Sequence, residues 1–294
     1  SLKGQNYFFD CGDDEENLSQ PNDSLHDMLR NLNIEHQYRM RNGAHNWDYW
    51  HGALPEALRY ISYSVQNIPY PADPEPINPG AVVPAERMFA EHAEGTNFQF
   101  NVTVPPAYLN DTKNYPVIVA LHDRNAVAQA EESQKLNSLI NTMMGENKIP
   151  ASLLVEIPLQ TEQLTPEILK QIVVQVQSKY RTIADRNHTL LLGNKQAGLL
   201  VYQLAPPCAQ QFNACLLFDA NIPADARVSN SDIGYYLDIT DKGINYKGYH
   251  SLYMSVRKNH LNHEYRVRRG TPTHQSFLNG LYESAAYINE HLNN

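Results

Sequence analysis

The stretch TLLLGNKQAGLLVYQLA, residues 189–205, constrains the fold of this chain more than any other. Its first four residues have the continuous apolar character of a parallel strand that is buried on both faces. Residues 193–197 then predict a sharp turn, and the apolar spacing from Gly198 to Ala205 predicts a helix. A buried strand that turns directly into a helix predicts an α/β fold, with Lys195 at the centre of the turn.

Composition limits the class of protein. The chain has 294 residues, enough for one large domain or two modest ones, and a formal net charge of -9. This charge, without any block of Lys and Arg, argues against nucleic acid as a partner. No window is long and apolar enough to cross a membrane, so a soluble protein without membrane contact is expected, and a secreted or periplasmic location is left open. The three cysteines are expected to be core thiols, and no cofactor or metal site is predicted.

The chain divides into three parts. In residues 1–66 we predict two strands (7–11 and 36–40) and two helices (23–33 and one around Trp50), which form only a piece of a sheet. Residues 67–84 contain six prolines and read as an extended linker. In residues 85–294, strands alternate with helices in the doubly wound α/β pattern. The predicted strands there are 99–104, 115–121 and 152–158, and the predicted helices are 131–144 and 166–180.

The end of the chain repeats its beginning. The segment YRVRRG at 265–270 repeats YRMRNG at 38–43, and AYI at 286–288 echoes RYI at 59–61, both with a spacing of 227 residues. We therefore interpret residues 1–66 as the C-terminal part of a first copy of the domain, and residues 85–294 as a complete second copy.

The second copy resembles the esterase branch of the α/β-hydrolases, which includes feruloyl, acetyl-xylan and enterochelin esterases. The resemblance rests on VPPAY at 104–108, YPV at 115–117 before Leu121 and His122, KYRT at 179–182, and the strand-turn-helix at 189–205. Residues 7–62 resemble the end of a second member, with the acidic loop at 9–15 and GAHNWDYW at 43–50. The resemblance implies a nucleophile elbow, G-x-S-x-G, at residues 193–197.

The resemblance also implies a serine, a histidine, a carboxylate and an oxyanion hole. In the second copy Lys195 stands at the nucleophile position, and the oxyanion loop reads His122-Asp123 where a glycine is typical. Gly243 matches the acidic Glu15, with Asp241 nearby as a carboxylate. We expect the histidine to survive as His274, displaced by a two-residue insertion. These losses predict a catalytically silent domain that serves as a structural or ligand-binding module.

The first copy keeps Asp14 or Glu15 as the orienting carboxylate and His45 as the base, and its elbow is expected upstream of Ser1 in a longer native protein. The alternative function is therefore an active serine esterase on carbohydrate or siderophore esters, acting through the first copy. A third hypothesis is a glycan or ester ligand in the silent pocket, contacted by Lys195 and nearby aromatic residues. The first copy is expected to be covered by the complete one or by another chain in an oligomer, since its apolar faces would otherwise be exposed.

Overall fold

The computed structural model describes residues 4–15, 17–123, 126–159, 163–229 and 232–293. One ten-stranded sheet has the order β1-β2-β10-β9-β8-β7-β5-β6-β4-β3. The strands are β1 (Phe8–Gly12), β2 (Gln37–Arg41), β3 (Met88–His92), β4 (Gln99–Thr103), β5 (Val117–His122), β6 (Leu153–Pro158), β7 (Thr189–Asn194), β8 (Ala214–Phe218), β9 (Gly234–Thr240) and β10 (His263–Arg268). The helices are α1 (Ser19–Asn31), α2 (Trp47–Val65), α3 (Ala126–Gly145), α4 (Pro166–Lys179), α5 (Lys195–Leu204), α6 (Tyr246–Lys258), α7 (His274–Glu283) and α8 (Ala285–Leu292).

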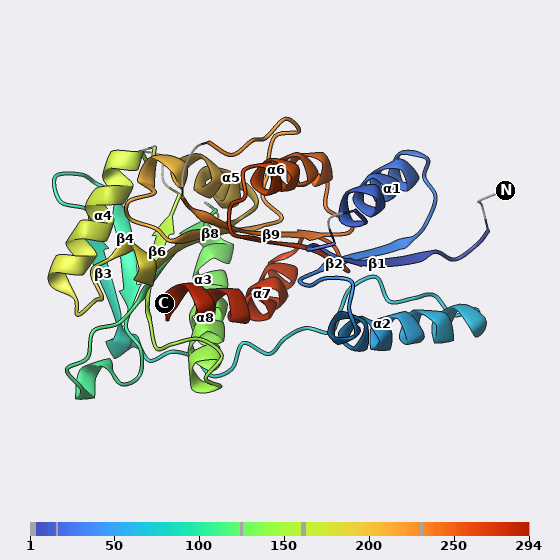
Figure 1. The fold of residues 1–294 in the computed structure, drawn as a ribbon. Helices are drawn as coiled ribbons and strands as arrows, with labels where there is room; N and C mark the ends of the chain where they lie inside the picture. The colour runs from blue at the N-terminus through green and yellow to red at the C-terminus, as the bar shows by residue number, and fades with distance from the viewer. Residues whose placement is uncertain (1–3, 16, 124–125, 160–162, 230–231, 294) are drawn as a thin grey trace.

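The complete domain, residues 85–293, is a doubly wound α/β fold, as the strand and helix pattern predicts. Strands β6, β5, β7, β8, β9 and β10 run parallel, and their side chains are almost wholly buried. Helices α5 and α6 lie on one face of the sheet, and α3, α7 and α8 lie on the other (Figure 1). Each face has its own apolar core because helices cover both sides of the strands.

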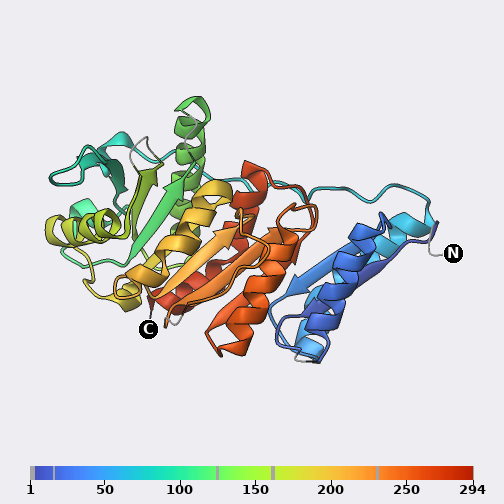
Figure 2. The same cartoon turned by 90° about the horizontal axis from the view of Figure 1, so that it is seen from above.

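The first unit, residues 4–66, extends the same sheet. Strands β1 and β2 pair in parallel, and β2 pairs antiparallel with β10 through Met40 and Val267. These two residues are separated by 227 positions, so the two units meet through equivalent strands in opposite directions. Helix α1 lies beside α6 on one face, and α2 lies on the face that carries α7 (Figure 1). Figure 2 shows the two units side by side, with the linker running along the complete domain.

The secondary structure of the first unit recurs at the end of the complete domain. Helix α1 matches α6 over its whole length at a spacing of 227, and α2 matches α7 and α8 together at the same spacing. Strand β1 matches β9 at a spacing of 228, because Phe8 pairs with Gln37 as Tyr236 pairs with Glu264. We call two residues related in this way matched positions.

Hydrogen bonds recur at matched positions as well. The Arg41 guanidinium binds Asp10 at 3.0 Å, and the matched Arg268 binds Asp238 at 2.6 Å. Asp13 accepts a bond from the Gly43 amide at 3.1 Å, and Asp241 accepts one from Gly270 at 3.1 Å. Both glycines have a φ near +130°, in the region that favours residues without Cβ. The two units therefore share these internal hydrogen bonds and ion pairs as well as the order of their helices and strands.

The linker follows the surface of the complete domain. The Asp73 carboxylate accepts bonds from the backbone and hydroxyl groups of Thr271, at 2.8 and 2.9 Å. Further along, the Ile77 amide donates to the Asn279 side chain at 3.0 Å. These contacts fix the path between α2 and β3 along one side of the complete domain.

Helix α2 has one buried face and one exposed apolar face. Its buried residues are Tyr49, Ala53 and Tyr60, which face the sheet. Leu54, Leu58 and Ile61 are 52 to 54% exposed. Helix α2 therefore carries apolar residues on two faces, and only one of them meets the two strands that the first unit provides.

Candidate functional site

The turn between β7 and α5 has the geometry of a nucleophile elbow. Lys195, its central residue, has a φ of 46°, a left-handed conformation that costs a non-glycine residue roughly 1–3 kcal/mol. A Cβ on Gly198 would lie 2.5 Å from the Ala220 side chain, so glycine is required for α5 to approach the segment after β8 this closely. Helix α5 begins at Lys195, earlier than the sequence predicts, which makes the turn tighter. The corner has the strained backbone of such an elbow, with a partly buried lysine at its centre.

Asp123 occupies the N-terminus of α5. Its carboxylate accepts a bond from the Ala197 amide at 2.6 Å. Burial raises the pKa of Asp123, while the backbone amides of Ala197 and Gln196 and the charge of Lys195 lower it. The amide that follows the nucleophile position is a donor of the oxyanion hole in this kind of elbow. The chain's own carboxylate therefore lies where that oxyanion would bind.

A cavity of about 230 Å³ lies in front of the elbow and is lined by Lys195, Asp123, Gly243 and Pro272. Gly243 is the matched position of Glu15, and Pro272 is the matched position of His45. The expected two-residue displacement of the histidine is not found, because α2 and α7 begin at the same spacing of 227 as the strands before them. Neither an imidazole nor an orienting carboxylate thus occupies its matched position in this cavity.

His274, the expected catalytic histidine, is the first residue of α7 and matches Trp47. Burial, together with the nearby His122, Lys135 and Lys195, lowers the pKa of His274 to about 4. Its Nδ1 lies 3.9 Å from the Glu132 carboxylate, and its ring packs against Phe277. This imidazole is neutral near pH 7 and belongs to the helix terminus rather than to a triad.

Asp241 supports the loop instead of orienting a base. Its carboxylate accepts the Gly270 amide at 3.1 Å and binds the Arg39 guanidinium at 3.0 Å. It matches Asp13, which holds the equivalent loop in the first unit. His122 is likewise held inside the sheet, with its Nε2 2.9 Å from Glu156. These two residues, predicted at the site, are placed as structural groups.

The first unit brings two predicted site residues together. Nδ1 of His45 lies 2.9 Å from a carboxylate oxygen of Glu15, whose other oxygen accepts the Gly12 amide at 3.1 Å. The Glu15 side chain is 5% exposed, whereas that of His45 is 61% exposed. Asp14 is exposed and contributes its amide to the Gly43 carbonyl. Of the two carboxylates that the sequence left open, Glu15 is the one that contacts His45.

Aromatic side chains surround His45. The edge of Trp50 meets the imidazole at 4.7 Å between ring centroids, and Trp47 lies 5.2 Å from Trp50. Trp50 is partly exposed, and Trp47 is 70% exposed. The core aromatic of this segment is Tyr49, which donates a bond to Asp10.

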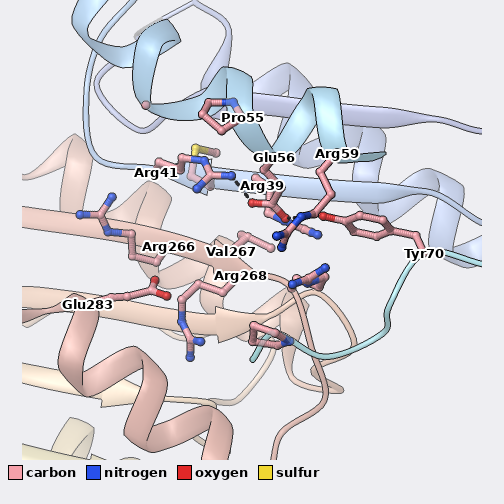
Figure 3. Close-up of a pocket in the computed structure, with 14 residues that line it drawn as sticks. Arg39, Arg41, Pro55, Glu56, Arg59, Tyr70, Arg266, Val267, Arg268 and Glu283 are labelled. Atoms are coloured by element: carbon pink, nitrogen blue, oxygen red, sulfur yellow. Dashed lines mark hydrogen bonds and ion pairs between the residues drawn. The ribbon is translucent and has the colours of Figure 1, made fainter. Parts of the chain in front are cut away.

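Sequence reasoning missed an arginine cluster where the two units meet (Figure 3). A cavity of about 610 Å³ lies there, between strands β2 and β10 and helices α2 and α7. Arg39 and Arg41 from β2 share the carboxylate of Glu56, and Arg39 also binds Asp241 of the complete domain. The repeated YR segments were the signal that could have found it. The ion pair between Arg39 and Asp241 joins the two units across the sheet.

The chain is similar to known proteins in its three-dimensional structure. No family model matches the chain, and no curated protein matches it. A ferulic acid esterase of known structure aligns with a TM-score of 0.59 at 14% identity, covering 70% of this chain and 97% of that one. This chain has the α/β-hydrolase fold.

Two further structures agree with this fold. A feruloyl esterase module from Clostridium thermocellum, complexed with sinapinate, has a TM-score of 0.57 at 15% identity and covers 76% of this chain and 95% of its own. S-formylglutathione hydrolase from Staphylococcus aureus has a TM-score of 0.54 at 8% identity and covers 71% of this chain and 98% of its own. The likeness in fold therefore extends to proteins with different substrates in their names.

Among the described residues, no group of three or more His, Cys, Asp or Glu side chains is placed to hold a metal ion. In the same part of the chain, no helix has the length and apolarity needed to span a membrane. The three cysteines, Cys11, Cys208 and Cys215, are buried free thiols.

Proposed function

We propose that the complete domain is a catalytically silent esterase-like module that serves as a structural platform for the first unit. The observation that carries this proposal is the cavity in front of the elbow. Lys195, Gly243 and Pro272 stand there in place of a nucleophile, an orienting carboxylate and a base. A serine esterase needs all three groups to act as a unit.

The chemistry of each replacement opposes ester hydrolysis. Lys195 has no hydroxyl group to form the acyl ester that a serine forms, and its side chain is partly buried. Pro272 cannot accept a proton. An ester oxyanion at the α5 amides would meet the Asp123 carboxylate, so like charges would repel at the position that should stabilise the transition state.

The test is hydrolysis of p-nitrophenyl acetate and methyl ferulate by the purified chain. We expect rates equal to those of a heat-denatured sample. Turnover that disappears on Lys195→Ala or His274→Ala, with the fold retained by circular dichroism, would refute the proposal. Turnover that survives both changes would point to a contaminant or to a site elsewhere, which the His45→Ala variant then resolves.

The contact between His45 and Glu15 favours a second candidate function, located in the first unit. We propose that these residues are the acid–base half of an ester hydrolase centre that acts on carbohydrate or siderophore esters. Glu15 holds Nδ1, which leaves Nε2 of the exposed imidazole free to take a proton from a nucleophile. The buried carboxylate would stabilise the imidazolium that forms. A serine hydroxyl in reach of Nε2 is the group that this half-site needs.

This candidate has a matched control within the chain. In an assembly that supplies a serine elbow, His45→Ala should reduce hydrolysis of methyl ferulate or acetylated xylan by about 10³-fold or more. His274→Ala removes an imidazole from the complete domain and should leave the rate unchanged. Equal rates for His45→Ala and the parent protein would exclude the half-site.

A further inference from the structure

Helix α2 exposes an apolar stripe that the complete domain buries at every matched position. Leu54, Leu58, Ile61 and Val65 are 52%, 54%, 53% and 82% exposed. The matched residues Leu281, Ala285, Ile288 and Leu292 are 0%, 8%, 0% and 1% exposed. We call Leu54, Leu58, Ile61 and Val65 the α2 stripe. Four neighbouring apolar side chains on one helix face are a surface that a partner covers in most proteins.

The edge of the sheet beside this stripe is also open. Strand β1 ends the ten-stranded sheet and pairs only with β2 among the described strands. The matched strand β9 pairs on that side with β8 in parallel, with Phe218 opposite Asp238. Unpaired backbone groups along an edge strand are a template for another strand.

The complete domain shows what covers both surfaces. There, the face of α7 and α8 that matches the α2 stripe packs into one apolar cluster with α3, β7 and β8. The covering elements α3, β7 and β8 all belong to residues 85–233. We propose that the β1 edge and the α2 stripe form the docking surface for an α/β half-domain equivalent to residues 85–233, which adds a parallel strand to β1.

A second copy of this chain is a poorer occupant. Its own β8 is already paired with β9, and its own α3 is already packed on α7. It therefore has no uncommitted half-domain to offer. Two chains could join their β1 edges antiparallel, but this pairing would not place an α3 equivalent on the α2 stripe.

The docked half-domain would also complete the half-site, so this inference rests on the second candidate function for its chemistry. In the complete domain the elbow residue Lys195 lines the same cavity as Gly243 and Pro272, the matched positions of Glu15 and His45. An elbow at the equivalent place in the partner would present its central residue to His45. A serine at that place would complete the set of groups that His45 and Glu15 need for ester hydrolysis.

Site-specific photocrosslinking in the cells that make the protein tests the docking. Benzoylphenylalanine replaces Leu58 in one variant and Val174 of α4 in the control, since these side chains are 54% and 58% exposed. Crosslinked peptides are identified by mass spectrometry. We expect at least tenfold more product from Leu58 than from Val174, with peptides from a segment that contains a strand, a G-x-S-x-G turn and a helix. The mass of the product shows whether this segment belongs to the same polypeptide or to a separate one.

Three outcomes would overturn the proposal. They are crosslinking of Leu58 to another copy of this chain, a yield equal to that of Val174, or a partner without a strand-turn-helix elbow. Hydrogen exchange gives an independent reading, because docking should slow exchange by at least tenfold at those β1 amides that do not already bond to β2 or to Glu15. The docking and the half-site can fail separately. If Leu58 crosslinks as expected but neither the parent protein nor His45→Ala hydrolyses esters, the docking stands and the half-site is excluded.

Discussion

Two leucines at matched positions allow the uncovered surface of α2 to be measured. Leu54 is 52% exposed, and Leu281 is 0% exposed. Replacing Leu281 with alanine removes buried methyl groups and leaves a cavity, which costs about 2–5 kcal/mol. Full burial of a leucine is worth roughly 1.5–3 kcal/mol, so the half-exposed Leu54 contributes about 1 kcal/mol, and water fills the space it leaves. Both changes occur in a helix, so the gain in helix propensity is the same and cancels in the comparison.

Urea unfolding followed by far-ultraviolet circular dichroism measures both variants. We expect the free energy of unfolding to fall at least 1 kcal/mol further in Leu281→Ala than in Leu54→Ala. Ile61 and Ile288 form a second matched pair of identical residues, at 53% and 0% exposure, and should show the same difference. Equal losses within each pair would mean that the α2 stripe is already covered in this chain, which would refute the reasoning.

Three other predictions concern the complete domain. The neutral His274, with a folded pKa near 4 against 6.5 unfolded, should cost about 3 kcal/mol of stability as the pH falls from 6.5 to 4, and His274→Gln should flatten this part of a pH series of urea titrations. Asp123→Ala should lower the unfolding free energy by about 1–2 kcal/mol because the first turn of α5 loses an acceptor, and Asp123→Asn should recover part of it. Lys195→Ser should yield no hydrolysis of methyl ferulate, since Gly243 and Pro272 remain; activity in this single variant would contradict the proposed loss of function.

The pattern of strands and helices was predictable because the parallel strands are continuously apolar. The strand at 189–192 and its glycine turn predicted β7 and α5, and the observed bounds differ by only a few residues. The faces of α2 were not predictable in the same way. Periodicity shows that a helix has an apolar face, but it cannot show which of two such faces meets the sheet. Tyr49 and Tyr60 took the inward positions, and Leu54 and Leu58 the outward ones.

Residue identity misled the assignment of the site. The sequence offered His274 as the counterpart of His45, since it is the nearest histidine after the repeated YR segment. The bounds of α2 and α7 show an unbroken spacing that places Pro272 there instead. Asp241 is a carboxylate in the loop where the sequence predicts one. Its bonds to Gly270 and Arg39 depend on how the chain folds, so the sequence alone does not reveal them. The role of Asp123 depends on the α5 amides, which the sequence cannot place.

Some groups of the first unit recur at matched positions of the complete domain and others do not. The cost in stability of losing each group explains which ones recur. The pairs Asp10–Arg41 and Asp238–Arg268 are partly or fully buried, and removing one partner from a buried pair leaves a charge that costs about 3–5 kcal/mol. His45 is exposed, so exchanging it for the proline found at its matched position leaves no buried charge. A copy can therefore lose its catalytic groups at little cost in stability while it must retain the pairs that hold β9 and β10 together. With this asymmetry, a domain without catalytic groups would still present an intact strand to β2, as the proposed structural platform requires.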